Sequence, residues 1–307
     1  MRIAVLAGGP SLEREVSLQS GQRVHRALGA RGHDAAVVDP SEPGFAERLS
    51  GGGFDACYVA LHGKHGEDGT VQRLLELLGL PYTGTGPAAC ARAFDKALAK
   101  DALAEAGIAT PAWTVLSADG LRDLGAGGVL HLVVERLGIP LVVKPSRGGS
   151  ALGVRFVDRE GDLASALMGA LSFDDRVVIE QRIEGKEVAV GFLGEEILPA
   201  VEIAPKEGIY DYAARYTTGA TEYFVPARLD QNVEVASRDT ADQAFRVLAV
   251  RGVGRADLMV DAHGRPWVLE VNVSPGMTDT SLLPMAAQAA GLSFEDLCDR
   301  IIRLSLP

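Results

Sequence analysis

Short apolar runs in the first 61 residues alternate with stretches whose apolar residues recur every three or four positions. The runs at 3–7, 35–38 and 56–61 are typical of buried strands. Between the first two runs, helical spacing predicts one helix through Leu12, Val16, Val24 and Leu28. This alternation indicates a mostly parallel sheet flanked by helices. Such sheets bind ligands at the carboxyl ends of their strands, where the loops starting at Gly8 and His62 lie.

The pattern continues with two more predicted helices. One covers 71–78 and ends at Gly79, and the other covers 94–106 and ends at Gly107. In the second helix, Leu98, Ala102 and Leu103 are expected to face inward.

The middle of the chain changes character and predicts a small α+β unit. Strands are expected at 139–144, 154–157 and 177–181, with a helix at 162–171. The Gly- and Ala-rich stretch 120–128 reads as a surface linker.

The last third is rich in strands. We expect them at 187–192, 197–203, 256–260 and 267–272, with a helix at 240–250. The long polar stretch 210–217 between strands is typical of a lid over a binding site.

Composition restricts the class of protein. The 307 residues carry a formal charge of −11 with a pI near 5.1, which argues against nucleic-acid or anionic-membrane surfaces. Cys57, Cys90 and Cys298 are too widely spaced for a disulfide framework or a CxxC zinc site. No signal peptide or membrane-length apolar run is evident, so we expect a cytoplasmic protein that binds no nucleic acid and does not enter the membrane.

Oxygen-bearing side chains interrupt two apolar strands near the end of the chain. Asp257 lies in one strand, and Glu270 and Asn272 lie two positions apart in the next. Burying such groups without partners is costly. A small set of carboxylate and amide oxygens suits Mg²⁺ that is also bound by the phosphates of a substrate. The alternative is a solvated polar edge, which the apolar neighbours disfavour.

A glycine-rich loop at 146–153 joins two predicted strands and could close over phosphates with its backbone N–H groups. Lys144 stands just before it, at the end of an apolar strand, and could reach a phosphate. Lys96, near a helix start, could do the same or be a solvated surface lysine. No Walker A pattern occurs, and the GxGxxA match at 84–89 is a weak dinucleotide signal because a poor strand precedes it.

Three further features suggest a small-molecule site. Glu13 could hold an ammonium group or simply complement a helix start. His62 lies in a glycine-flanked loop, where binding residues concentrate, although a lone histidine is often structural. After the oxygen-bearing strand, the turn at 274–278 and a helix start at Ser281 and Leu282 could offer N–H groups to an anion.

Together these pieces resemble the D-alanine–D-alanine ligases of the ATP-grasp group, over nearly the whole chain. The matching stretches are EREVS at 13–17, LHGKHGEDG at 61–69, LPYTG at 80–84, KPSR at 144–147, YDY at 210–212, GRAD at 254–257 and EVNVSPGMT at 270–278. Their order and spacing make the resemblance specific.

The resemblance implies an α/β plus α+β fold with three domains, at 1–95, 96–182 and 183–307. The first domain holds the first D-alanine, and the other two enclose ATP and carry the metal site and the lid. It also implies a homodimer that makes D-alanyl-D-alanine for the cell wall, with ATP as co-substrate and two Mg²⁺ ions that Mn²⁺ can replace.

The family's site residues transfer onto matching positions. Glu13, Ser150 and Tyr216 match the set that positions the first D-alanine and holds the lid, and His62 matches a residue near the reacting amine. Lys96, Lys144 and Arg215 match nucleotide-contacting positions, and Glu180 and Glu187 match the adenine-side and ribose-side acids. Asp257, Glu270 and Asn272 match metal ligands, Arg255 and Gly276 match groups that stabilise the reacting carboxyl oxygens, and Ser281 and Leu282 match the pocket of the second carboxylate.

The chain departs from the family pattern at a few positions. Arg215 stands where lysine is usual, Gly148 where glutamate is common, Ala151 where serine is common, Gln181 where lysine is common, and Val273 where threonine is common. We expect an active enzyme with altered nucleotide affinity. Tyr216 favours D-alanine over D-lactate as second substrate, because relatives that form depsipeptides tend to have phenylalanine there.

Other functions stay open at this point. They are a ligase that takes D-lactate or D-serine as second substrate, a nucleotide-binding regulator without turnover, and an oxidoreductase that uses the weak dinucleotide match.

Overall fold

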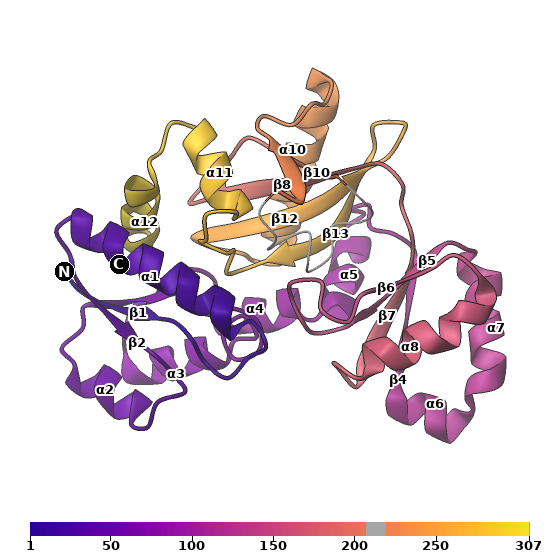
Figure 1. The fold of residues 1–307 in the computed structure, drawn as a ribbon, viewed down its shortest axis with the longest axis horizontal. Helices are drawn as coiled ribbons and strands as arrows, with labels where there is room; N and C mark the ends of the chain where they lie inside the picture. The colour runs from indigo at the N-terminus through magenta and orange to yellow at the C-terminus, as the bar shows by residue number, and fades with distance from the viewer. Residues whose placement is uncertain (207–218, 307) are drawn as a thin grey trace.

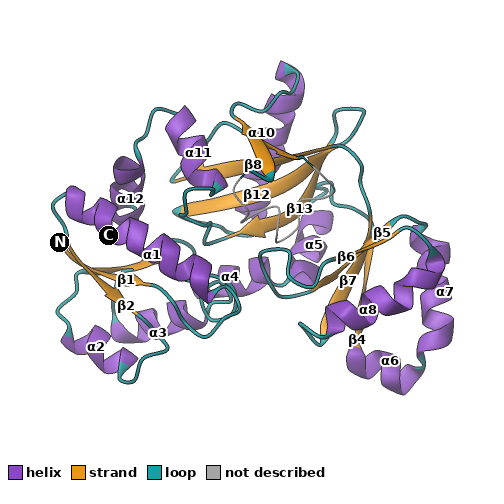
Figure 2. Cartoon of the chain, viewed as in Figure 1, coloured by secondary structure: helices purple, strands orange, loops and turns teal. Residues whose placement is uncertain are grey.

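The computed structural model describes residues 1–206 and 219–306. In this part of the chain the strands form three sheets, and Figure 1 shows them spread along the long axis of the molecule. The sheet built from the first third of the chain lies at one end, the sheet from the middle of the chain at the other, and the sheet from the last third between them. Helices cover the sheets, as Figure 2 shows.

The N-terminal sheet is parallel, as the sequence predicts. Its strand order is β2-β1-β3, and its strands are β1 (Arg2–Leu6), β2 (Asp34–Val38) and β3 (Ala56–Val59). The central strand β1 is buried from Ile3 onward because it has a neighbour on each side and helices over its faces. The helices from this part of the chain are α1 (Arg14–Ala30), α2 (Phe45–Gly51) and α3 (Thr70–Leu78).

The last helix of the chain, α12 (Phe294–Arg303), returns to the N-terminal sheet. It packs against α1 and β3 through Leu297, Ile301 and Ile302, which recur at helical spacing and are buried. The two ends of the chain therefore lie near each other (Figure 1).

The middle sheet is antiparallel, with the order β4-β7-β5-β6. Its strands are β4 (Trp113–Ser117), β5 (Leu141–Pro145), β6 (Arg155–Val157) and β7 (Arg176–Gln181). Its helices are α6 (Ala118–Leu124), α7 (Ala126–Leu137), the 3-10 turn η1 (Glu160–Asp162) and α8 (Leu163–Leu171). The linker expected at 120–128 is wrong, because α6 and the start of α7 cover this stretch and only Gly125 lies between the two helices.

The large sheet follows the order β11-β10-β8-β12-β13, and the short β9 pairs with β8. Its strands are β8 (Lys186–Leu193), β9 (Glu196–Ile197), β10 (Val201–Pro205), β11 (Thr221–Phe224), β12 (Val253–Val260) and β13 (Pro266–Asn272). The single strand expected at 197–203 is wrong, because β9 and β10 are separate strands and residues 198–200 between them belong to neither.

Both faces of the large sheet are covered. Val188 and Val190 of β8 pack in the core with α4 (Pro87–Phe94), α5 (Lys96–Glu105) and α10 (Gln231–Val247). Ala189 and Leu193 point to the opposite face, toward α11 (Leu282–Ala289). Strand β8 is therefore apolar on both faces.

Four sequence expectations about helices need correction. The helix expected at 94–106 is α5, which begins only at Lys96, because Asp95 has an extended backbone and caps α5 with its side chain; Phe94 is the last residue of α4. Leu98 is 47% exposed rather than inward, and Leu12 precedes α1 and is 75% exposed. The helix expected at 240–250 begins earlier, at Gln231.

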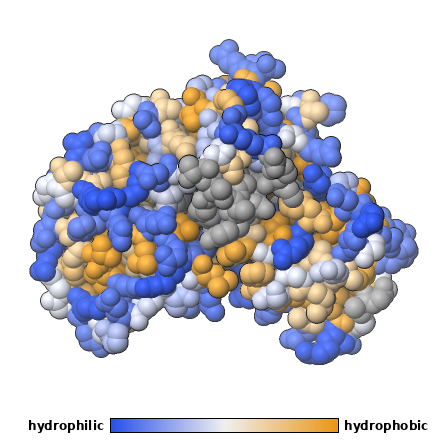
Figure 3. Space-filling view, viewed as in Figure 1, coloured by the Kyte–Doolittle hydropathy of each residue, from blue (hydrophilic) through white to orange (hydrophobic). Residues whose placement is uncertain are grey.

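The surface of the molecule is mixed in hydropathy. In Figure 3 hydrophilic residues cover the outer rim of the molecule and the tip of α10, with hydrophobic residues in patches between them. Within the described residues, no helix has the length and apolar character needed to cross a bilayer.

Candidate active site

A cavity of about 450 Å³ lies between the middle sheet and the large sheet. Its walls come from β5, β7 and the loop after β5 on one side, and from β8, β10, β12 and β13 on the other. Apolar side chains line part of it (Val142, Val154, Phe156, Ile203, Met259 and Leu269), and charged side chains line the rest (Lys96, Lys144, Arg182, Glu180, Glu184, Glu187, Asp257 and Glu270). The cavity can therefore hold a ligand with both a flat apolar part and an anionic part.

Lys144, at the carboxyl end of β5, is buried and paired with Glu180 of β7. Its Nζ lies 2.5 Å from Glu180 Oε1, and Lys100 Nζ of α5 lies 2.8 Å from Glu180 Oε2. Burial alone would raise the pKa of Glu180, but the two lysines hold that pKa below its ordinary value. Glu180 is therefore a buried carboxylate shared by two cations.

Lys96 reaches the cavity from the first turn of α5. Its Nζ donates to the carbonyl oxygen of Gly148 at 2.6 Å and lies 3.3 Å from Glu270 Oε2. It is therefore a cavity lysine, and the alternative of a solvated surface lysine does not hold for this structure.

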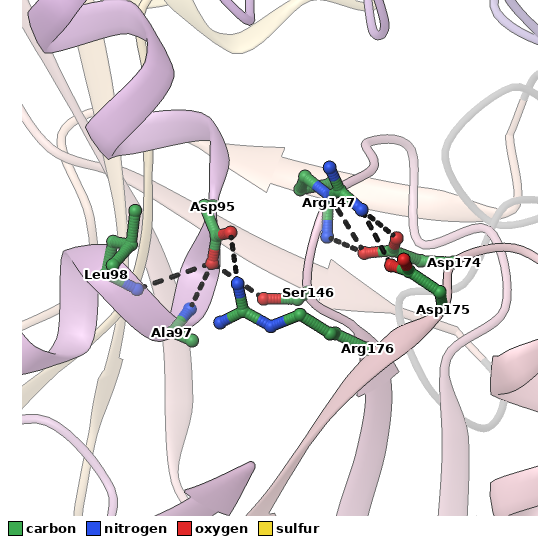
Figure 4. A network of polar contacts seen from close by, with 8 residues as sticks. All are labelled: Asp95, Ala97, Leu98, Ser146, Arg147, Asp174, Asp175 and Arg176. Carbon is green, nitrogen blue, oxygen red and sulfur yellow. Dashed lines mark hydrogen bonds and ion pairs between the residues drawn. The ribbon is translucent and has the colours of Figure 1, made fainter. Parts of the chain in front are cut away.

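A polar network fixes the start of α5 to the glycine-rich loop (Figure 4). Asp95 accepts from the backbone N–H groups of Ala97 and Leu98, as an N-cap does, and from Ser146 Oγ at 2.7 Å. Arg176 donates to its other oxygen at 3.3 Å. Because Asp95 binds both α5 and Ser146, Lys96 and the loop keep a common position.

Arg147 anchors the next residue of the loop. Its guanidinium and backbone N–H donate to Asp174 at 2.7–3.3 Å, and Nη2 also donates to Asp175 at 2.7 Å (Figure 4). The glycines that follow, Gly148 and Gly149, line the cavity, and no atom outside the chain neighbours lies within 4 Å of where a Cβ on Gly148 would be. Hydrogen bonds and ion pairs thus fix the start of the loop at Arg147, whereas Gly148 faces open space in the cavity.

The three expected metal ligands lie on neighbouring strands. Asp257 of β12 pairs in register with Glu270 of β13, and Arg255 pairs with Asn272. Asp257 and Glu270 line the large cavity, whereas Asn272 lines a small adjoining pocket. Within the described residues, no group of three or more His, Cys, Asp or Glu side chains could hold a metal by itself. This donor set suits an ion that takes its remaining ligands from a phosphate and water.

Arg255 joins the two cavities. It is buried, and it donates to both oxygens of Asp257, at 2.6 and 2.7 Å. With its amide nitrogen turned toward Glu67 (2.7 Å), Asn272 accepts from Arg255 through its oxygen at 2.9 Å. The guanidinium therefore lines the small pocket while it holds an acid of the large cavity.

The small pocket, of about 60 Å³, is bounded by the start of α1, the loop after β3, the glycine-rich loop, strands β12 and β13 and the segment before α11. Ser150 Oγ donates to Glu13 Oε1, which connects residues 137 positions apart. Glu67 lies beside them and accepts from the backbone N–H of Gly63 at 2.8 Å. Burial, together with the nearby carboxylate of Glu13, raises the pKa of Glu67 well above its ordinary value.

His62 is buried at the wall of this pocket with both ring nitrogens occupied. Nδ1 lies 3.1 Å from the carbonyl oxygen of Ser274, and Nε2 lies 3.0 Å from Ser20 Oγ, which accepts from Met277 N–H at 3.1 Å. Because a carbonyl only accepts, the network assigns the proton to Nδ1. Burial, with a smaller contribution from Arg255, lowers the pKa of His62 to about 4, so the ring is neutral at pH 7.

The far wall of the small pocket is the turn before α11. Gly276 approaches Ser281 so closely that a Cβ would lie 2.8 Å from Ser281 Oγ, so a side chain there would displace the Ser281 hydroxyl. Ser281 precedes the helix and accepts from Thr278 N–H at 2.9 Å, and Leu282 begins α11 and is buried. The turn and helix start expected from the sequence are confirmed.

The structure also tests two glycine patterns. The N–H groups of Gly8 and Gly9 are bound by Ser17 Oγ and Asp39 Oδ1, both at 2.9 Å, so this loop offers neither to a ligand. The GxGxxA match at 84–89 begins outside any named strand, and Gly86 is the N-cap of α4 with Pro87 as its first residue. The 84–89 match therefore lacks the strand that precedes the glycine loop of a dinucleotide site.

Sequence reasoning missed some residues that the structure places at the site. Lys100 lies four positions after Lys96 on the same helix, and that i, i+4 spacing was an available signal. Ser20 and Glu67 gave no such signal, because their partners are distant along the chain. Arg215 and Tyr216 lie outside the described residues.

Comparison with known proteins agrees with this geometry. Two family models match, "D-ala D-ala ligase N-terminus" over residues 43–85 and "D-ala D-ala ligase C-terminus" over 102–303. A D-alanine–D-alanine ligase of Bordetella petrii is 45% identical over 98% of this chain and 91% of its own length.

Solved structures show the same similarity. A D-alanine–D-alanine ligase from Bacillus anthracis covers 99% of this chain and 97% of its own, at 35% identity and a TM-score of 0.86. The same enzyme complexed with ATP covers the same shares at 34% identity and a TM-score of 0.84. With the family models covering most of the chain, these findings show that this protein is a ligase with the ATP-grasp fold and belongs to the D-alanine–D-alanine ligase family.

Proposed function

We propose that this protein joins two D-alanine molecules with the consumption of ATP, and so makes a precursor for the cell wall. The observation that carries the proposal is that two different cavities share the wall at Gly149. One cavity holds lysines and oxygen ligands, as a nucleotide needs, and the other holds Glu13, Ser150 and Arg255, as an amino acid needs. A phosphoryl group at their boundary can pass from one ligand to the other.

The nucleotide belongs in the large cavity. Lys96 and Lys144 are placed to bind its phosphates as point charges, next to the glycine-rich loop. Glu180 and Glu187 are assigned to the base and sugar ends, near the apolar lining that suits an adenine ring. A similar ligase crystallised as a complex with ATP supports ATP as the nucleotide.

Asp257, Glu270 and Asn272 would hold Mg²⁺ together with the phosphates, with Mn²⁺ as a substitute. When bound, such ions neutralise charge that develops on the transferring phosphoryl group. Asp257 is already oriented by Arg255, and Glu270 by Lys96, so the carboxylates are held in place at the cavity wall.

The two D-alanine molecules belong in the small pocket. Glu13 is the anion for the ammonium group of the first, and Ser150 orients it. Arg255 and the backbone of Gly276 would stabilise the oxygens of the reacting carboxyl group. Ser281 and Leu282, at the start of α11, would receive the carboxylate of the second molecule, and His62 would lie near its amine.

Chemistry at this site needs no covalent enzyme intermediate. The γ-phosphoryl group of ATP moves to the carboxylate of the first D-alanine, the amine of the second attacks the acyl phosphate, and phosphate leaves. The hydroxyl of Ser150 is committed to Glu13, so we assign it a positioning role. Water must be excluded because it would hydrolyse the acyl phosphate.

Several expectations stay predictions. The lid and its residues Arg215 and Tyr216 lie outside the described residues, and the domain boundaries at 1–95, 96–182 and 183–307 and the homodimer are untested. We propose that the enzyme works in the cytoplasm, where ATP is found; its three buried cysteines are free thiols, as is usual in that reducing compartment.

The test is ATP-derived phosphate release by the purified full chain, with product identified by mass. With Mg²⁺, ATP and D-alanine, we expect phosphate and D-alanyl-D-alanine in equal amounts, and neither when D-alanine or ATP is left out. Phosphate at the background rate in the complete mixture would contradict the proposal. Adding D-serine or D-lactate to D-alanine shows by product mass whether a mixed ligase is the better description.

A further inference from the structure

Lys100 is among the most completely buried large side chains of the described residues, and it is 1% exposed. It does not line the large cavity, because it stands behind Glu180, on the side away from the ligand space. A lysine in such a place is rare, since burying an ammonium group is costly unless it is paired. Its position therefore calls for an explanation beyond packing.

The surroundings of Lys100 keep its ammonium group in one place. Its Nζ donates to Thr110 Oγ1 at 2.6 Å and to the carbonyl oxygen of Pro111 at 3.2 Å, and it lies 5.1 Å from the centre of the Trp113 ring. The ion pair to Glu180, at 2.8 Å, completes the set. Burial lowers the pKa of Lys100 to about 8, which leaves most of the group charged at pH 7.

Glu180 is thus bonded from two sides by different cations. Lys144 approaches Oε1 from the cavity wall, at 2.5 Å, and Lys100 approaches Oε2 from behind. Two cations and one anion leave a net charge of about +1. Because all three side chains are almost fully buried, water screens this charge little, and it acts on whatever occupies the cavity.

We propose that Lys100 neutralises Glu180 from behind, so that the positive charge of Lys144 stays available to a phosphate of the nucleotide. Without Lys100, Lys144 and Glu180 would cancel each other, and an incoming phosphate would meet a buried carboxylate without net attraction. Lys100 is a positioning residue in this scheme, because it acts through Glu180 and Lys144. The inference rests on the proposed function, since it takes ATP as the ligand of the cavity.

The test compares Lys100→Met with the unmodified chain. Calorimetry with Mg-ATP in the absence of D-alanine measures nucleotide binding without turnover, and steady-state assays give KM and kcat. We expect the Kd and the KM for ATP to rise about tenfold, with kcat at saturating ATP within threefold and the KM for D-alanine unchanged.

Leu103→Ala is the matched control for a merely structural effect. Leu103 is buried on the same helix, so its truncation lowers the melting temperature without changing any charge. We expect the Kd for ATP to stay within twofold of the unmodified value. An equal loss of affinity in both variants would overturn the proposal.

A double variant separates charge from contact. In Lys100→Met/Glu180→Gln the anion is removed together with its rear cation, so the Kd should return to that of Glu180→Gln alone. The proposal is overturned if Lys100→Met binds ATP within twofold of the unmodified chain, or if the double variant binds as weakly as Lys100→Met.

The same comparison serves if Lys100→Met alone does not fold. In the Glu180→Gln background, adding Lys100→Met must then leave the Kd unchanged, and a tenfold loss there overturns the proposal. Failure of the proposed function looks different, because the unmodified chain itself would then bind no Mg-ATP and release no phosphate with D-alanine.

Discussion

The large cavity and the small pocket share a wall at Gly149, yet they are built in different ways. The large cavity lies between strands of two sheets, and charged side chains in its walls form ion pairs, Lys144 with Glu180 and Lys96 with Glu270. The small pocket is enclosed mainly by loops from four parts of the chain, joined by hydrogen bonds such as that from Ser150 to Glu13.

The difference indicates what each region can recognise. Ion pairs between long lysine and glutamate side chains can rearrange when a highly charged ligand arrives, because each lysine has several donors and rotatable bonds. The small pocket is lined by acidic, basic and hydroxyl side chains in a confined space, which suits small, zwitterionic ligands. Asp257 and Arg255 connect the two regions, so changes there should affect both.

The largest expected effect is at that connection. Asp257→Asn keeps the volume but removes both the negative charge of a proposed metal ligand and an acceptor for Arg255. We expect kcat to fall about a thousandfold, as for loss of several kcal/mol of charge stabilisation. Steady-state phosphate release measures this, and Asp261→Asn, just after the end of β12 and outside the cavity lining, is the control. Activity within tenfold of the unmodified chain would show that the two regions are not joined through Asp257.

The next effect concerns stability of the small pocket against acid. The pKa of His62 is about 4 in the folded chain and near 6.5 when unfolded, so the folded state favours the neutral ring. The contribution of His62 to the free energy of unfolding is therefore fully present above pH 6.5. It is lost as the pH falls toward 4, by about 3 kcal/mol in all.

Urea unfolding at pH 7, 6, 5 and 4 measures that loss. His62→Gln should lose the part of the pH dependence that His62 causes, whereas His263→Gln, at an exposed position, should follow the unmodified chain. If the free energy of unfolding changed with pH in the same way for His62→Gln and the unmodified chain, His62 would have the same pKa in the folded and unfolded states, which contradicts the prediction.

A smaller effect is expected at the ammonium site. Glu13→Gln removes the charge that Ser150 orients, and a hydrogen bond to a charged group contributes roughly 1.5–3 kcal/mol. We expect the KM for the first D-alanine to rise about 10- to 100-fold, with the KM for ATP little changed. Glu15→Gln, two positions away and exposed, is the matched control. Unchanged kinetics in Glu13→Gln would remove Glu13 from the site.

The smallest effect is expected at the shared wall. A Cβ on Gly149 would lie 2.8 Å from Glu13 Oε2, so Gly149→Ala displaces the carboxylate rather than the backbone. Because the added methyl group overpacks the site at a cost of about 1 kcal/mol, the KM for the first D-alanine should rise about fivefold. The Kd for Mg-ATP should stay the same. A larger loss of ATP binding than of D-alanine binding would reverse the roles we assign to the two regions.

How far the sequence could predict this molecule varies with the residue. The parallel N-terminal sheet followed from alternating apolar runs, and the start of α11 followed from a turn pattern, because both are local signals. Leu98 was misplaced because the buried face of α5 runs through Ala97, Lys100 and Leu103, and a pattern of apolar residues does not anticipate a buried lysine. The linker expected at 120–128 failed because glycines there suggested a loop where two helices form.

The residues at the site divide in the same way. Asp257, Glu270, Asn272 and Lys144 could be named from the sequence because hydrophilic groups in apolar strands are costly without a purpose. Family and fold class were likewise available from the motifs and their order. The pairing of Glu180 with Lys100, the bonds of His62 to Ser20 and Ser274, and the sharing of Gly149 by two cavities come only from the tertiary structure. They join residues up to 212 positions apart, and local patterns along a chain carry no information about which distant partner a side chain meets.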